Sequence, residues 1–327
     1  MPSANGAGTF YSAIWDTSGT DWLIHNGSTD ATIDLRAATL EYEIGGGGFV
    51  SQVEGIFGGL TIAHDVVIEN ARGGDGDDII QGNDVSNRVV GGGGEDRLYG
   101  RNGNDFLEGG DGGDALFGGG GIDTASFRDS TSGVTADLRD GVGSRGEASG
   151  DTYSLIENLA GGDYTDSLRG DNTNNRLDGR EGNDFLYGRG GDDFLNGGAN
   201  SDVLNGGAGD DTLTGSTGAD TLDGGSGDDT LLGGTNDGNE DTFVFSLGYD
   251  EDRINGYEQG NDRIELDNVL WAGNSNIVSR KSVIDEFGSL NANGTILTLD
   301  FGGGDVLEVQ NSAGIDFNTL GSDLLIV

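Results

Sequence analysis

Residues 161–232 decide the fold, and in units of nine they read GGDYTDSLR, GDNTNNRLD, GREGNDFLY, GRGGDDFLN, GGANSDVLN, GGAGDDTLT, GSTGADTLD and GGSGDDTLL. Position eight is Leu in all eight units, and position six is Asp in every unit except the second, where it is Asn. A flexible glycine-rich linker needs no register. A strict period of nine over 72 residues therefore indicates a repeated, folded unit.

Each unit combines a glycine-rich stretch with a short apolar one. Positions one to six predict a tight turn, because glycine adopts left-handed backbone conformations without steric cost. Positions seven to nine predict a three-residue strand whose middle side chain points inward. Two units complete one coil of 18 residues, so each unit stacks on the next but one. We therefore expect an all-β fold of stacked coils with a leucine core.

Position six predicts a metal site between stacked turns. Calcium is a hard cation that takes six to eight oxygen ligands, which carboxylates and backbone carbonyls supply. The stacked pairs of this block are Asp166/Asp184, Asp184/Asp202, Asp193/Asp211, Asp202/Asp220 and Asp211/Asp229, with Asn175/Asp193 as a weaker sixth.

Residues 73–126 form a first block of six such units, which begins GGDGDDIIQ. Its stacked pairs are Asp78/Asp96, Asp96/Asp114 and Asp105/Asp123, with Asn87/Asp105 weaker. Position-one glycines leave room for a backbone carbonyl to approach a cation, so we expect ligands at Gly73, Gly91, Gly100, Gly109, Gly118, Gly188, Gly197, Gly206 and Gly224. Together the blocks predict eight two-aspartate calcium sites, or ten if the asparagine pairs also bind.

Three further segments flank the two blocks. Residues 1–72 predict irregular β strands that lead into the first roll, residues 127–160 an inserted β segment, and residues 233–327 a β cap of the kind that repeat solenoids need at their ends. The tripeptide Ile-Glu-Asn that precedes the first block at 68–70 recurs before the second block at 156–158. The chain therefore looks like a duplicated unit in which an irregular segment is followed by a roll.

The composition indicates that the chain needs a bound partner to neutralise its charge before it can fold. Asp and Glu number 58 against 16 Lys and Arg, the net charge is −42, and only 33% of residues are hydrophobic. Such a chain stays disordered unless its charge is neutralised, and metal cations are the expected agent. Nucleic acid and anionic membranes are poor partners because a basic face is missing. Cysteine is absent, no stretch is long enough to span a membrane, and the first residues lack the pattern of a signal peptide.

Several segments together resemble the C-terminal RTX β-roll region of serralysin-type secreted metalloproteases. They are AIWDTSGTDWL at 13–23, TIAHDVVIENARGGDGDDIIQGN at 61–83, the nonapeptides and the ending DLLIV at 323–327. The resemblance implies a right-handed parallel β-roll with calcium in its turns, an extracellular location, and export by type I secretion machinery that reads the C-terminus. The alternative for 323–327 is a final strand of the cap.

The resemblance also implies, by position, that Asp16 and Asp21 help to bind a calcium ion at the entrance of the first roll. The sequence Asp21-Trp22-Leu23 imitates the end of a nonapeptide, whereas the Arg-x-Gly-x-Thr segment that completes this site in the family is not found before Asp16. A plain turn rich in aspartate is the alternative.

Catalysis is not expected from this chain. Proteases of that type hold zinc with H-E-x-x-H, but His25 and His64 are followed by Asn and Asp. We therefore predict a non-catalytic calcium-binding protein whose folding is driven by extracellular calcium. Two alternatives remain open. One is the C-terminal part of a serralysin-like protease whose N-terminal catalytic domain lies outside this chain, and the other is a calcium-stiffened surface, matrix or adhesin module.

Overall fold

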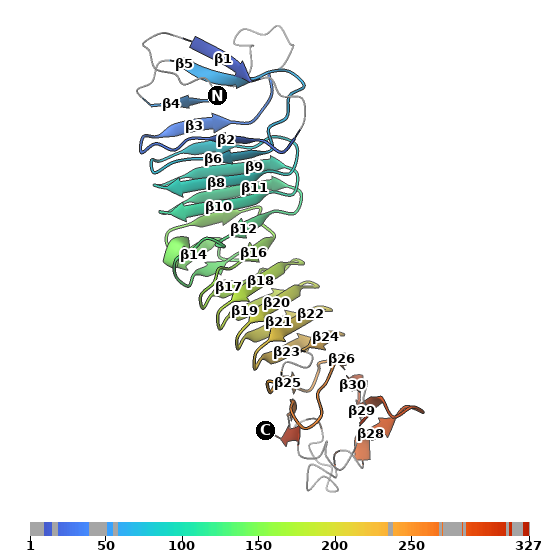
Figure 1. The fold of residues 1–327 in the computed structure, drawn as a ribbon. Helices are drawn as coiled ribbons and strands as arrows, with labels where there is room; N and C mark the ends of the chain where they lie inside the picture. The colour runs from blue at the N-terminus through green and yellow to red at the C-terminus, as the bar shows by residue number, and fades with distance from the viewer. Residues whose placement is uncertain are drawn as a thin grey trace. The chain divides into compact units, whose positions relative to one another are not determined.

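The computed structural model describes residues 10–14, 19–38, 51–54, 58–234, 238–267, 270, 283, 286–311, 314–315 and 323–326. The chain divides into two compact units, residues 1–130 with 134–158 and residues 131–133 with 159–327. Long sheets of mainly parallel strands make up both units, so the prediction of an all-β parallel roll is confirmed (Figure 1).

In the first unit, successive strands alternate between two sheets. One sheet has the order β2-β6-β8-β10-β12 and the other β15-β11-β9-β7-β3-β4. The strands of this unit are β1 (Phe10–Ile14), β2 (Trp22–Ile24), β3 (Ala31–Asp34), β4 (Gln52–Val53), β5 (Gly58–Ile62), β6 (Asn70–Arg72), β7 (Ile79–Gln81), β8 (Arg88–Gly93), β9 (Arg97–Asn102), β10 (Phe106–Asp111), β11 (Ala115–Gly120), β12 (Thr124–Ser126), β13 (Thr135–Asp137), β14 (Val142–Arg145) and β15 (Thr152–Ser154).

Strands outside the nonapeptides complete this unit. Strand β4 pairs antiparallel with β3, and β1 pairs with β5 in a separate two-stranded sheet. Within the inserted segment β14 pairs antiparallel with β13 and β15, and the 3-10 turn η1 (Gly146–Ala148) follows β14. Strand β16 (Asn158–Ala160) lies where the two units meet in sequence.

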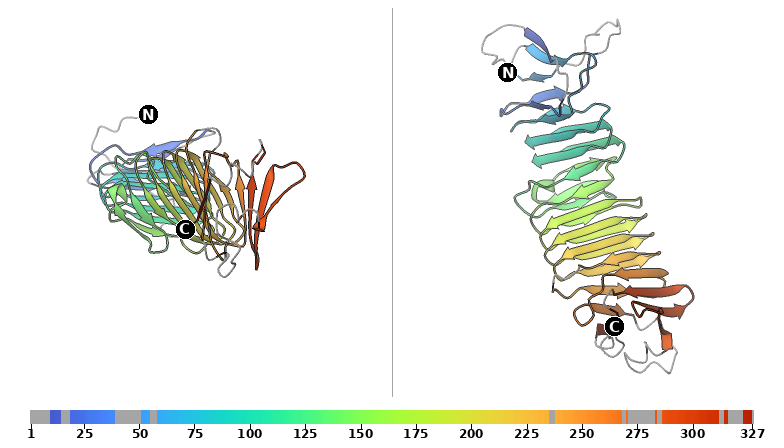
Figure 2. Two further views of the ribbon diagram at one scale, coloured as in Figure 1. Left: turned by 90° about the horizontal axis from the view of Figure 1, so that it is seen from below. Right: turned by 45° about the vertical axis from the view of Figure 1, so that its right-hand side comes forward.

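The second unit repeats the alternation. Its sheets have the orders β18-β20-β22-β24-β26-β30-β29-β28 and β31-β27-β25-β23-β21-β19-β17, and Figure 2 shows their strands stacked one on the next. The strands are β17 (Ser167–Arg169), β18 (Arg176–Glu181), β19 (Phe185–Gly190), β20 (Phe194–Ala199), β21 (Val203–Ala208), β22 (Thr212–Thr217), β23 (Thr221–Ser226), β24 (Thr230–Leu232), β25 (Thr242–Phe245), β26 (Glu251–Asn255), β27 (Arg263–Leu266), β28 (Gly288–Leu290), β29 (Ile296–Gly302), β30 (Asp305–Gln310) and β31 (Leu324–Ile326).

The core is a ladder of position-eight side chains. Leu186 pairs with Leu204, which pairs with Leu222, and all three are fully buried. The other sheet of the unit stacks Leu195 on Leu213 in the same way. Each coil places its leucine directly over that of the preceding coil. The leucines therefore form one continuous core, although only 33% of the residues are hydrophobic.

The strands are longer than predicted. A full nonapeptide strand such as β20 covers six residues, because positions two and three of the following unit pair again with the next coil. In these six-residue strands position two lies at positive φ, as at Gly198 (φ 111°) and Arg189 (φ 82°). In β19 the ladder skips Gly188 and resumes at Arg189 opposite Gly207. The chain therefore changes direction inside the strand, and positions four to six suffice for the turn.

The parallel stacking continues past the last nonapeptide. Strand β25 pairs with β23, β26 with β24, and β27 with β25, all in parallel register. Strand β31, from the C-terminal DLLIV sequence, pairs with β27, and Leu324 is fully buried there. The described part of the C-terminus is thus a structural strand of the cap.

Candidate metal centre

The position-six residues of stacked turns are linked directly. We call each link between residues 18 apart a rung. In every rung the backbone N–H of the earlier residue donates to the side-chain Oδ1 of the later one, as Asp184 N–H does to Asp202 at 2.8 Å. The rungs join Asp78 to Asp96, Asn87 to Asp105, Asp96 to Asp114, Asp105 to Asp123, Asp166 to Asp184, Asn175 to Asp193, Asp184 to Asp202, Asp193 to Asp211, Asp202 to Asp220 and Asp211 to Asp229.

The second oxygen of most rung carboxylates is buried without a hydrogen-bond partner. Within the part of the chain that the structure describes, this holds for Oδ2 of Asp96, Asp105, Asp114, Asp123, Asp184, Asp193, Asp202, Asp211 and Asp229. These residues are between 0% and 3% exposed. An ionised oxygen in such a position is strongly unfavourable unless a cation or proton meets it.

Backbone carbonyls approach the same oxygens. A Cβ added to Gly206 would overlap Asp211 Oδ2 and lie 2.6 Å from the carbonyl oxygen of Gly224. The carboxylate oxygen of one turn and the carbonyl oxygen of the next therefore converge beside this glycine. The predicted position-one glycines Gly73, Gly91, Gly100 and Gly188 have the same two neighbours, whereas at Gly109, Gly197 and Gly224 the nearest atoms all belong to the aspartate of the same turn.

Burial changes the acid–base behaviour of the rungs. It raises the pKa of Asp96 to about 7, that of Asp202 to about 8 and that of Asp211 to about 6. The backbone N–H of the preceding turn opposes this rise, and neighbouring carboxylates, such as Asp184 and Asp220 around Asp202, add to it. The geometry thus brings together acid groups that resist ionisation without a counter-charge.

A hard divalent cation fits this set of oxygens. Among the described residues, no three carboxylate or imidazole side chains gather closely enough to hold a metal. His25 bonds to the carbonyl of Thr29, and His64 lies exposed beside Asp65. A cation at a rung would therefore combine carboxylate Oδ2 atoms with backbone carbonyls, which is the ligand chemistry of calcium.

The predicted sites that contain asparagine are built differently. Asn87 Oδ1 accepts the N–H of Asn83 at 2.8 Å, and Asn87 Nδ2 donates to the carbonyl of Glu69 at 2.7 Å. An amide donor therefore faces a carbonyl that could otherwise serve a cation. Asn175 Oδ1 similarly accepts the N–H of Asp171 at 2.7 Å.

The first position-six aspartate of each block also has local partners. Asp78 Oδ2 accepts the N–H of Gly74, and Asp166 Oδ2 that of Gly162, each at 2.7 Å. Both carboxylates are thus bonded within their own turn, unlike the nine carboxylates named above.

The predicted entrance site is described only in part. Asp16 lies outside the described residues. The backbone N–H of Asp21 donates to Glu69 Oε2 at 2.8 Å, so Glu69 acts there as a position-six aspartate does in a rung.

Sequence reasoning missed the glutamates of the two Ile-Glu-Asn tripeptides. Glu157 Oε2 accepts the N–H of Asp123 at 2.8 Å, as Glu69 does for Asp21. The signal was present, because Glu69 and Glu157 stand 18 residues before Asn87 and Asn175.

Four aspartates outside the nonapeptides also extend the rungs. Asp151 accepts the N–H of Asp114, Asp241 that of Asp220, Asp252 that of Asp229, and Asp262 that of Asp241. Their spacing is irregular, but each stands two residues before a buried large side chain, namely Tyr153, Phe243, Ile254 and Ile264. This Asp-x-apolar pattern is the part of the nonapeptide that they retain.

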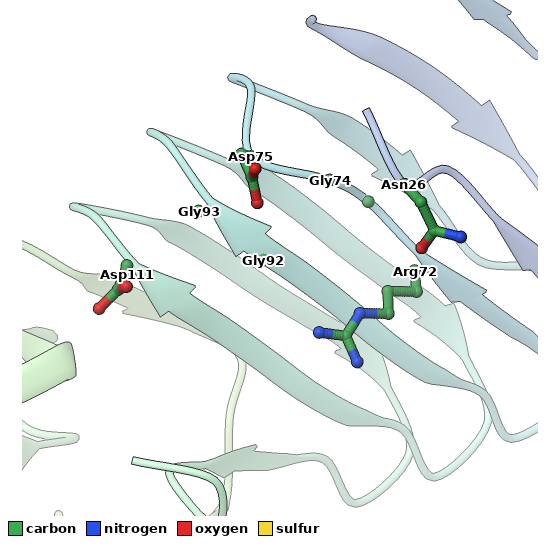
Figure 3. Close-up of a pocket in the computed structure, with 8 residues that line it drawn as sticks. Asn26, Arg72, Gly74, Asp75, Gly92, Gly93 and Asp111 are labelled. Atoms are coloured by element: carbon green, nitrogen blue, oxygen red, sulfur yellow. The ribbon is translucent and has the colours of Figure 1, made fainter. Parts of the chain in front are cut away.

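The first unit also carries a surface hollow of about 370 Å³ (Figure 3). It is lined by Asn26, Arg72, Gly73, Gly74, Asp75, Gly92, Gly93 and Asp111. Asp75, Asp111 and Arg72 are exposed, so their charges are solvated, in contrast to the buried rungs. The rungs are therefore the stronger candidate for a metal centre.

Comparison with known proteins agrees with this geometry. The family model of the RTX calcium-binding nonapeptide repeat (4 copies) matches residues 68–96, 90–125, 160–195, 169–204, 196–231 and 205–239. Serralysin from Proteus mirabilis is 42% identical over 76 residues, which are 23% of this chain and 13% of that protein. Serralysin from Photorhabdus luminescens is 43% identical over 74 residues, again 13% of its length.

The solved structure of extracellular lipase LipA from Serratia marcescens matches with 18% identity, covering 83% of this chain and 44% of that one, with a TM-score of 0.29. No helix in the described ranges is long and apolar enough to cross a membrane. The repeat matches span both rolls and contain the rungs. This chain therefore carries RTX calcium-binding nonapeptide repeats that are similar to the repeats of serralysins.

Proposed function

We propose that this chain is a calcium-dependent folding module of a secreted protein, in which calcium ions bind at the rungs and drive folding. The observation that carries the proposal is the series of buried Oδ2 atoms that have no hydrogen-bond partner among the described residues. Each two-aspartate rung predicted above would take one ion, which gives about eight ions.

The chain's own residues explain why folding would depend on the ion. Without calcium, the net charge of −42 expands the unfolded chain, and the folded chain would have to bury ionised carboxylates. A bound ion supplies the missing positive charge. Because the stacked turns exist only in the folded state, the free energy of binding adds to the free energy of folding.

This dependence suits an extracellular location. Inside a cell, where free calcium is scarce, the chain would remain unfolded, which is the state that a type I exporter requires. Outside, calcium would order the coils. The proposed export signal is the C-terminal sequence 323–327, whose residues 324–326 form β31 in the folded chain.

A calcium titration followed by circular dichroism tests the proposal. In chelator at pH 8 the spectrum should be that of an unfolded chain, and calcium should produce a cooperative gain of β-sheet signal. Magnesium at the same concentration should have much less effect, because it demands octahedral geometry and loses its water reluctantly. A β-sheet spectrum in chelator that calcium does not change would contradict the proposal.

The protease alternative is supported by a separate observation, namely that serralysins from Proteus mirabilis and Photorhabdus luminescens match the repeat region at 42% and 43% identity. The matched segment spans only 13% of their length. We therefore keep the proposal that this chain is the C-terminal part of a serralysin-like protease. An in-frame H-E-x-x-H sequence upstream of residue 1 would support it, if the longer protein that includes this sequence also cleaves a protein substrate in a calcium-dependent way. A longer protein without that motif would exclude it.

A further inference from the structure

The first roll ends at a buried carboxylate whose next turn comes from outside the repeats. Asp123 is the last position-six residue of the first block and is 0% exposed. Its Oδ2 has no hydrogen-bond partner among the described residues. The nonapeptide period stops at residue 126, so the turn that stacks on Asp123 must be supplied by a non-repeat segment.

That segment begins at Leu155. Glu157 Oε2 accepts the backbone N–H of Asp123 at 2.8 Å, which reproduces the bond made by a position-six aspartate. The backbone N–H groups of Glu157 and Asn158 in turn donate to the carbonyl of Asp123 at 3.1 Å and 2.9 Å. The segment is therefore held against Asp123 by three hydrogen bonds.

The carbonyl of Leu155 stands where a glycine carbonyl stands in a regular turn. A Cβ added to Gly118 would overlap the Leu155 carbonyl oxygen and lie 2.5 Å from Asp123 Oδ2. One coil earlier, a Cβ on Gly100 would overlap Asp105 Oδ2 and lie 2.7 Å from the carbonyl oxygen of Gly118. The same two kinds of oxygen thus converge at both positions.

Leu155 adopts a backbone conformation that leucine normally avoids. Its φ is 55°, and its side chain is 64% exposed, so packing of the side chain does not compensate for the left-handed conformation. The conformation sets the direction of the Leu155 peptide group, and with it the carbonyl beside Asp123.

We propose that Asp123 Oδ2, the Leu155 carbonyl and the Glu157 carboxylate form a calcium site that closes the first roll outside the nonapeptide repeats. This inference rests on the proposed function, because it assumes that rung oxygens bind calcium. The Ile-Glu-Asn tripeptide then has a chemical role, in which its glutamate replaces the aspartate of a repeat.

The test is a count of bound calcium ions by native mass spectrometry of the full chain across a calcium titration. Glu157→Gln keeps an acceptor for the Asp123 N–H but removes the charge, so this variant should bind one ion fewer than the wild type. Glu95→Gln is the matched control, because Glu95 is an exposed residue of the same roll at position five. Leu155→Gly keeps the carbonyl and permits the φ, so both this variant and the control should bind the wild-type number.

A second readout is amide hydrogen exchange in the wild type. Calcium should slow the exchange of the Glu157 and Asn158 amides, which bond to Asp123. An unchanged ion count and affinity in Glu157→Gln would overturn the inference. Should that variant fail to fold, exchange at these two amides that does not respond to calcium would overturn it instead. A wild-type chain that binds no calcium at all would refute the proposed function itself.

Discussion

Replacing Gly206 by alanine tests whether the space beside each position-one glycine is essential to a rung. A Cβ at Gly206 would overlap Asp211 Oδ2 and lie 2.6 Å from the Gly224 carbonyl oxygen, against about 3.5 Å for an ordinary contact. The carboxylate cannot simply swing away, because Asp211 Oδ1 accepts the N–H of Asp193 at 2.7 Å. Either that bond breaks or the backbone moves.

Gly190→Ala is a matched control in the same roll. A Cβ there would meet its nearest atoms, the Ala208 carbonyl oxygen and the Asn172 Cα, at 3.7 Å. We expect Gly190→Ala to change the free energy of unfolding by less than about 1 kcal/mol, because the added methyl group meets no close atom and also stiffens the unfolded chain. Gly206→Ala should lower the free energy of unfolding by about 1–3 kcal/mol through overpacking. This variant should also bind one calcium ion fewer.

Urea unfolding in saturating calcium, combined with an ion count by native mass spectrometry, measures both effects. The expected result is a lower urea midpoint and one missing ion for Gly206→Ala, with neither change in Gly190→Ala. Equal midpoints and equal ion counts for the two variants would refute the reasoning that carboxylate and carbonyl oxygens share a cation beside Gly206.

Three further predictions concern the core, the protons and the C-terminus. Leu204→Ala should lower the free energy of unfolding by about 2–5 kcal/mol in urea titrations, whereas Val203→Ala on the outer face should lower it far less; similar losses would contradict an inward leucine ladder. Because burial raises the rung pKa values from 3.8 to about 6–8, the calcium-free fold retains protons that the unfolded chain releases. In chelator the folded fraction should therefore be greatest near pH 4 and be lost as pH rises to 8, and a β-sheet circular dichroism signal that grows over that range would be inconsistent. Deleting 323–327 removes the fully buried Leu324 and should lower the melting temperature of the calcium-bound chain as well as stop export; an unchanged melting temperature would mean that β31 does not stabilise the cap.

The period of nine predicts the parallel roll, the inward Leu204 and the stacking of Asp184 on Asp202, because each follows from fixed spacing alone. Residues outside the repeats were not predicted as rung partners, since loops of other lengths separate them: Asp252 follows Asp229 by 23 residues. Only its place two residues before the buried Ile254 identifies it. The sequence also does not predict the position of the Leu155 carbonyl, because its direction depends on a backbone angle that a leucine rarely adopts.

The hydrogen bonds of the rungs all run in one direction, and this gives a growing stack two unlike ends. At the C-terminal end of a partial roll, the last coil presents an unfilled backbone amide, as Asp184 would without Asp202. At the N-terminal end, the first coil presents an unfilled carboxylate oxygen. A coil added at the C-terminal end thus bonds to a backbone N–H, whereas a coil added at the N-terminal end bonds to a carboxylate. A roll is in this respect a polar stack within a single chain, because an added coil contributes the carboxylate acceptor at the C-terminal end and the backbone donor at the N-terminal end.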